Sequence, residues 1–198
     1  MGKGETAIAD APRTRAASLP PDERRSMIVN ATLPLLLEHG EMVTSRQIAD
    51  AAGIAEGTIF RVFDDKDAVI AAVIEAAFDT EPLERALRAI DLAQPLEACV
   101  VTATAILQQR VVDTWRLVSS IGTRFHEKTR RPMVDSDALV TLFEAHRKHL
   151  TVEPIAAARL LRAFTLSLTH PMLADEPMSP AEIVKLFLHG VSGRDASC

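Results

Sequence analysis

Helical periodicity is the feature that most constrains this chain. From Asp22 onward, apolar residues recur at intervals of three and four, and Val/Ile runs with the two-residue period of strands are absent. The glycines and prolines fall mostly between the helical stretches, where they interrupt or end helices. The pattern therefore predicts an all-α protein.

Length and composition exclude several other classes. The chain has 198 residues, of which 47% are hydrophobic and 25% charged, as in an ordinary globular protein of one or two small domains. Its two cysteines, Cys99 and Cys198, cannot form a disulfide framework or a paired zinc site. The start lacks an apolar signal segment, and no apolar run is long enough to cross a membrane. We therefore expect a cytoplasmic protein without membrane contact and without a metal or other cofactor.

The helical stretches divide the chain into three parts. Residues 1–20 lack periodicity and are expected to form a flexible arm. A first domain should cover residues 21–80 and a second, larger one residues 81–198. Breakers and caps place the helices at about 22–39, 45–52, 56–63 and 66–79, and then at 82–93, 95–121, 135–149, 153–173 and 180–191.

The stretch from Thr44 to Lys66 is the most informative part of the sequence. Two short helices are joined by Ala-Gly-Ile, and Gly53 stands where a tight turn needs a positive φ. Ile48 and Ala49 on the first helix can pack against Ile59 on the second. This is the layout of a helix-turn-helix, in which the second helix enters the major groove of DNA.

With its flanks, this stretch resembles the DNA-binding domain of the TetR/AcrR family of bacterial transcriptional regulators. The resemblance covers about residues 22–75. It is carried by Ile28, Ala31 and Leu35, by Glu38-His39-Gly40, by Thr44 to Ala49, by Ala52 to Phe60, and by Phe63 to Asp67.

The resemblance implies an all-helical homodimer with an N-terminal DNA-reading domain and a C-terminal helical bundle that binds a ligand and dimerises. It implies contacts to backbone and base edges by Ser45 and Arg46, a base-facing Arg61, and phosphate contacts by Thr58 and Lys66. The full set of expected DNA-binding residues is Thr44, Ser45, Arg46, Ala55, Glu56, Gly57, Thr58, Phe60, Arg61 and Lys66.

Three positions depart from the family pattern. Phe60 stands where the family most often has a tyrosine, so a hydroxyl contact to phosphate should be missing. Val62 replaces a frequent histidine, and Ala55 replaces the usual serine before the second helix, where alanine is a weaker cap. These departures place more of the affinity on Arg46, Arg61 and Lys66.

The C-terminal helices differ from the others. Apolar residues cover most of the circumference of 153–173, leaving Arg159, Arg162 and Thr165 as a narrow polar strip. Such a helix should be buried nearly all round, inside a bundle or against another subunit. Together with the wide apolar stripe of 180–191, this favours a homodimer through these two helices, with simple core packing as the alternative.

The second domain should also hold a small apolar effector. An apolar cavity with a few polar groups is the usual form of such a site. The candidate lining residues are Trp115, Phe125, His126, Phe143 and Phe164, for each of which plain core packing is the alternative. The histidines are too scattered to suggest a metal.

These observations favour a ligand-responsive regulator that represses from a pseudo-palindromic double-stranded DNA operator. The alternative is a constitutive helix-turn-helix protein without an effector. An enzyme finds no support, because no phosphate loop, nucleophile elbow or paired metal motif is present, and no catalytic residue is expected.

The charge balance qualifies this expectation. The net charge of −5 lies in residues 1–80, which hold 8 Lys and Arg against 13 Asp and Glu. A net negative charge disfavours general attraction to DNA. We therefore expect weak non-specific binding to DNA. Affinity for a specific site should depend on a few positioned cationic side chains, and a dimer has twice as many of them.

Overall fold

The computed structural model describes residues 20–121, 125 and 134–190, and these contain helices and no strand. The predicted all-α class is confirmed, and no described helix has the length and apolar character needed to cross a membrane. The elements are α1 (Pro21–His39), η1 (Gly40–Met42), α2 (Ser45–Ala52), α3 (Glu56–Ile59), α4 (Lys66–Ala77), α5 (Glu81–Arg88), α6 (Leu96–Ser120), α8 (Asp137–Ala145), η3 (Arg147–His149), α9 (Pro154–Ser167) and α10 (Pro180–His189). The predicted arm lies almost wholly outside the described residues.

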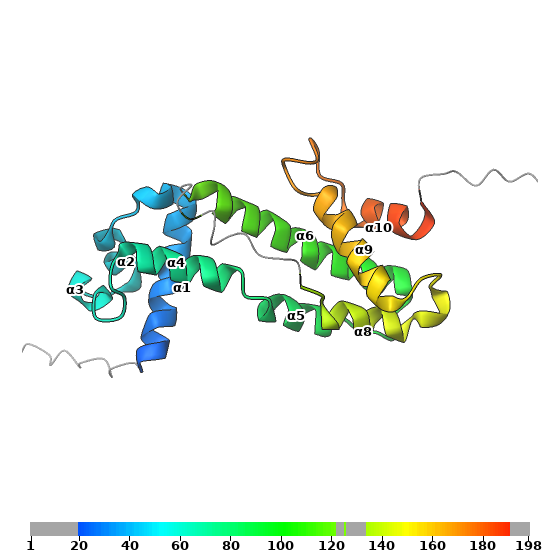
Figure 1. Cartoon of the computed structure of the whole chain (residues 1–198), viewed down its shortest axis with the longest axis horizontal. Coiled ribbons are helices and arrows are strands. Elements are labelled where there is room, and N and C mark those ends of the chain that lie inside the picture. Colours follow the sequence, from blue (N-terminus) through cyan, green and yellow to red (C-terminus); the bar gives the residue numbers. More distant parts are fainter. Residues whose placement is uncertain (1–19, 122–124, 126–133, 191–198) are drawn as a thin grey trace, which may run out of the picture.

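The helices form an elongated molecule with two ends (Figure 1). Helices α1 to α4 gather at one end, which we call the head, whereas α5, α8, α9 and α10 gather at the other, which we call the body. Helix α6 belongs to both, because it packs on α9 and α10 in the body and its last residues reach α1 in the head. The 25 residues of α6 therefore connect the two ends directly.

Each end has its own apolar core. The head core is built around fully buried Ile28, Leu36, Ile48 and Ile70. It also contains Leu117, Ile121 and Phe125, which come from the end of α6 and beyond it. The body core is built from residues of α5, α6, α8, α9 and α10, among them Leu87, Val100, Leu139, Leu161 and Val184. The division near residue 80 remains a prediction, and the head core draws on residues well beyond it.

Several helices are shorter than predicted. Helix α5 ends at Arg88 instead of residue 93, and α8 ends at Ala145 instead of residue 149. Helix α3 ends at Ile59 instead of continuing to residue 63, and the chain goes on in turns that keep a hydrogen bond from the Phe63 N–H to the Ile59 carbonyl. Glycine at position 57 and the lack of a side-chain cap on α3 both weaken this helix. Helix α9 ends at Ser167 instead of residue 173, shortly before Pro171, which disfavours helical backbone in the preceding residue.

The prediction that 153–173 is buried nearly all round is wrong for the single chain. Ala157, Ala158 and Leu161 are buried, but Ile155 is 41% exposed, Leu160 46% and Phe164 36%. The prediction that Thr165 belongs to a polar strip is also wrong, because Thr165 is buried and its hydroxyl donates to the Leu161 carbonyl at 2.8 Å. The described chain covers one side of α9 and leaves these three apolar residues partly exposed.

Candidate nucleic-acid interface

The start of α2 is held by a reciprocal cap. The Thr44 hydroxyl oxygen accepts a hydrogen bond from the Gln47 N–H at 3.2 Å, and the Gln47 side-chain oxygen accepts one from the Thr44 N–H at 2.8 Å. Thr44 is therefore a cap residue first, and its hydroxyl also donates to Gln47. Arg46, the second residue of the helix, is exposed, and Ser45 is half-buried.

Gly53 makes the turn that joins α2 to α3. Its φ of 65° and ψ of 32° lie in the left-handed region, and its N–H bonds the carbonyls of Ala49 and Asp50. The next residue, Ile54, donates its N–H to the Ala49 carbonyl at 3.0 Å. This closes α2 as a Schellman-type end and sends the chain directly into α3, as the sequence predicted.

Helix α3 presents most of its expected DNA-binding residues to the outside. Ile59 is fully buried against the head core and fixes the orientation of the helix. Five expected contact residues are exposed around it: Ala55, Glu56, Gly57, Phe60 and Arg61. Thr58 is half-buried, and its N–H closes the first turn onto the Ala55 carbonyl at 2.8 Å.

Lys66 connects α4 to the turn that leads into α2. Its ammonium group donates to the carbonyl oxygens of Glu41 and Val43, both at 2.9 Å. Two of its three N–H donors are thus used inside the head, which leaves one for a phosphate. A phosphate contact by Lys66 remains a prediction, and the structure adds a second role, because the lysine fixes the approach to α2.

Replacing Lys66 with alanine should lower the free energy of unfolding by about 1–3 kcal/mol, because two partly buried carbonyls lose a charged donor. Urea denaturation measures this loss. If Lys66 also meets a phosphate, the same variant should flatten the salt dependence of DNA binding by about one unit of slope. An unchanged stability would contradict the bracing role, and an unchanged salt slope would remove the phosphate role.

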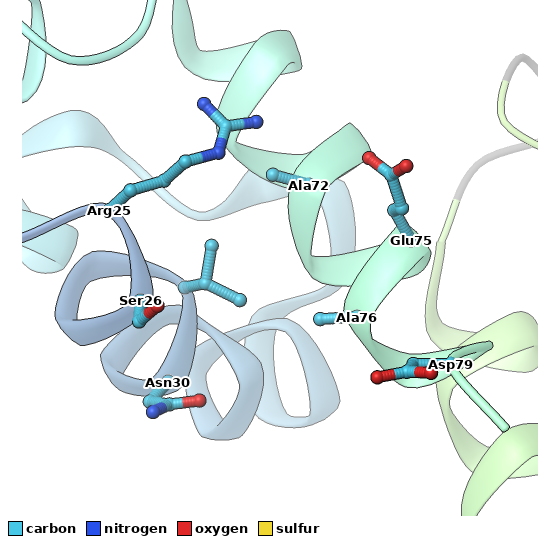
Figure 2. A pocket seen from close by; sticks show the side chains of 8 residues that line it. Arg25, Ser26, Asn30, Ala72, Glu75, Ala76 and Asp79 are labelled. Atoms are coloured by element: carbon cyan, nitrogen blue, oxygen red, sulfur yellow. The ribbon is translucent and has the colours of Figure 1, made fainter. Parts of the chain in front are cut away.

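Charged side chains of opposite sign stand at the two ends of an open groove of about 490 Å³ between α1 and α4. Figure 2 shows Arg25 from α1 at one end of this groove and Asp79, just beyond α4, at the other. The Arg25 guanidinium lies 4.4 Å from the ring centroid of Phe63, which follows α3. A cation therefore stands on the α3 side of the head, and the carboxylates of Glu75 and Asp79 lie at the body end of α4.

The five candidate effector residues do not form one wall. Phe125 is buried in the head core and Phe143 in the body core. Phe164 is partly exposed and packs edge-on against Phe187 of α10, with ring centroids 6.0 Å apart. His126 lies outside the described residues. Phe125 and Phe143 thus fill two separate cores, and an effector contact by any of the five residues remains a prediction.

Trp115 does line a cavity, together with residues that sequence reasoning missed. The cavity has a volume of about 340 Å³, and its wall includes Phe78, Arg110, Thr114 and His170. The Trp115 and His170 rings meet edge to face with centroids 4.6 Å apart. The sequence signal was the position of Arg110 on the same amphipathic helix as Trp115, one turn before Thr114, but the contribution of residues 78 and 170 depends on tertiary packing. Among the described residues, no cluster of three or more His, Cys, Asp or Glu could hold a metal ion.

The paired short helices, the left-handed glycine between them and the exposed second helix define a helix-turn-helix DNA-binding protein. Residues 28–73 match the family model described as bacterial regulatory proteins, tetR family. The N-terminal part of the chain is therefore similar to the bacterial regulatory proteins of that family.

Solved structures with a similar fold extend over most of the chain. A transcriptional regulator of the TetR/AcrR family from Thermobifida fusca YX-ER1 is 19% identical, with a TM-score of 0.58, covering 86% of this chain and 100% of that one. The repressor SmeT of the Stenotrophomonas maltophilia multidrug efflux pump SmeDEF is 23% identical, with a TM-score of 0.50, covering 83% and 86%. FadR from Bacillus subtilis, solved with stearoyl-CoA, is 14% identical, with a TM-score of 0.52, covering 84% and 99%. At these identities the likeness concerns the fold. No curated protein matches the chain by sequence.

Proposed function

We propose that this protein is a ligand-responsive repressor that binds a pseudo-palindromic operator as a homodimer and is released by a small apolar effector. The observation that carries the proposal is the pairing of an exposed α3, held by buried Ile59, with a body that contains a cavity beside the end of α4. SmeT is described as a repressor and FadR was solved with stearoyl-CoA, so relatives of this fold include both properties.

Dimerisation is supported by the open side of α9. Leu160 and Phe164 are one helical turn apart on α9 and form an apolar surface that the described chain leaves partly exposed, and we call it the α9 surface. Isolated apolar residues on a surface need no explanation, but several on one helix favour an interface. A two-fold axis through this surface would present two α3 helices to successive major grooves.

Helix α4 is the element through which a bound effector would act. Its twelve residues span about 18 Å, from Lys66, which bonds the approach to α2, to Phe78, which caps α4 and lines the cavity. An effector that binds one orientation of α4 more tightly shifts the population of head positions toward that orientation. Release from DNA then needs only a few kcal/mol of differential affinity.

Selection of bound duplexes from genomic fragments tests the function. We expect a sequence-enriched, pseudo-palindromic site that is lost when its effector is added. If no enriched duplex emerges, the regulator proposal fails. Enrichment that no apolar small molecule reverses would instead favour the constitutive helix-turn-helix protein.

Arg61 provides the residue-level test. Its exposed side chain follows α3, and arginine is suited to bidentate contacts with guanine. Arg61→Ala should weaken operator binding by about 10- to 100-fold and binding to random duplex much less. Gel-shift titrations against both duplexes measure the two losses, and an equal loss on both would reduce Arg61 to a phosphate contact.

A further inference from the structure

The cavity beside Trp115 is apolar on most of its wall and lies where α4, α6 and the end of α9 meet. Phe78 contributes from the end of α4, and Leu166 from α9. Three further lining residues, Val111, Trp115 and Val118, are apolar side chains of α6. A volume of about 340 Å³ is near the lower end of the range of about 300–1,000 Å³ for small-molecule sites. The cavity therefore suits a small, largely apolar molecule.

Among the described residues that line this wall, Arg110 is the one that carries a full charge. Its guanidinium donates to the backbone carbonyl of Asp79 at 2.9 Å, and no carboxylate among the described residues lies within ion-pair distance of it. Burial lowers the pKa of Arg110 from its ordinary value, while the nearby carboxylates of Asp79 and Asp113 act against that shift. Neither of those carboxylates lines the cavity. The cavity thus faces the partly buried guanidinium of Arg110, which has N–H donors beyond the one that bonds the Asp79 carbonyl.

Two more polar groups face the same space. The hydroxyls of Thr102 and Thr104 on α6 bond the carbonyls four residues earlier, but that of Thr114 has no such partner among the described residues. His170 accepts the Met172 N–H at its Nδ1, 3.2 Å away, so the neutral ring carries its proton on Nε2. The wall therefore offers hydrogen-bond donors beside a cation.

We infer that this cavity binds a small apolar monocarboxylate, with its carboxylate on Arg110 and its hydrocarbon part against Trp115. A monovalent head group matches a single guanidinium, whereas a phosphate would call for more cationic donors than the wall supplies. The inference deepens the proposed function, because it names the chemical class of the effector, and it rests on that function for its regulatory meaning.

Trp115 is the only tryptophan of the chain, which contains no tyrosine, so its fluorescence reports on this cavity. The experiment titrates the full-length protein, without DNA, with octanoate and phenylacetate and with the amide of each acid. Isothermal calorimetry follows the same titrations, so that binding without a fluorescence change is also detected. We expect each acid to bind about tenfold or more tightly than its amide, because only the acid forms a charge-assisted bond to Arg110.

Arg110→Gln should abolish most of this preference, and Arg110→Lys should keep part of it. The matched control is Arg116→Gln, because Arg116 is an exposed cation of α6 that lines a neighbouring cavity and not this one. The inference is overturned if neither acid binds by either method, if acid and amide bind equally, or if the preference survives in Arg110→Gln. Because no DNA is present, carboxylate binding by a protein that selects no duplex would overturn only the regulator proposal. If the protein binds an operator but neither acid, only the inference of a carboxylate ligand is overturned.

Discussion

Gly40→Ala should lower the free energy of unfolding by about 3–5 kcal/mol. Gly40 ends α1 with a φ of 57° and a ψ of −147°, a region in which residues with a Cβ are strained by about 1–3 kcal/mol. A Cβ at this position would also overlap the backbone oxygen of Ser120, at the end of α6. Because backbone cannot swing aside as a side chain can, the overlap adds about 1–3 kcal/mol. Chemical denaturation of the purified variant measures the loss.

Gly53→Ala is the matched control. Gly53 also has a positive φ, of 65°, but a Cβ there would meet no atom within 4 Å. Its replacement should cost about 1–2 kcal/mol, from backbone conformation alone. The difference between the two variants reports on the contact between the head and α6, and equal losses would show that this contact contributes nothing to stability.

Leu160→Glu should convert the proposed homodimer to a monomer. Leu160 is 46% exposed in the single chain and lies on the α9 surface that we propose as the dimer interface. A two-fold axis places the substitution in the interface twice, and each unpaired buried carboxylate is strongly unfavourable, so self-association should weaken about a thousandfold or more. Sedimentation velocity gives the oligomeric state, and operator affinity should fall with it.

Ala86→Glu separates interface disruption from a general effect of added charge. Ala86 is an exposed residue of α5, which packs on α6 and α8. This variant should remain dimeric and bind the operator normally. If Leu160→Glu stays dimeric, the α9 surface is not the dimer interface. If Ala86→Glu becomes monomeric, loss of the dimer is a general effect of added charge and not specific to Leu160.

The helix-turn-helix was predictable because its determinants are local. Thr44 and Gln47 cap α2 across three residues, and Gly53 supplies the left-handed turn that ends it. The spacing of these three residues can be read directly from the sequence, so the bounds of α2 were predicted correctly. The length of α3 was less well predicted, because a four-residue helix depends on the packing of Ile59 and not on its own weak cap.

Contacts between residues that are distant in sequence, in the head as well as in the body, were less predictable. Lys66 bonds carbonyls 23 and 25 residues earlier, and His170 meets the ring of Trp115 from beyond α9. Aromatic content suggested a single effector site, but the sequence does not say which aromatic side chains fill a core. Trp115, which was named as a candidate effector residue, lies in the wall of a cavity, and its effector contact stays a prediction. Arg110, in the same wall, was not named at all.

The sharing of Leu117, Ile121 and Phe125 with the head core has a consequence for protein engineering. A head excised near residue 80 would lose these three buried side chains and leave apolar surface open to water. A chimera that transplants this DNA-reading end onto a foreign sensor would therefore need to bring the last turns of α6 with it. The useful junction for such grafts lies within α6, and the linker after α4 is the wrong place to cut.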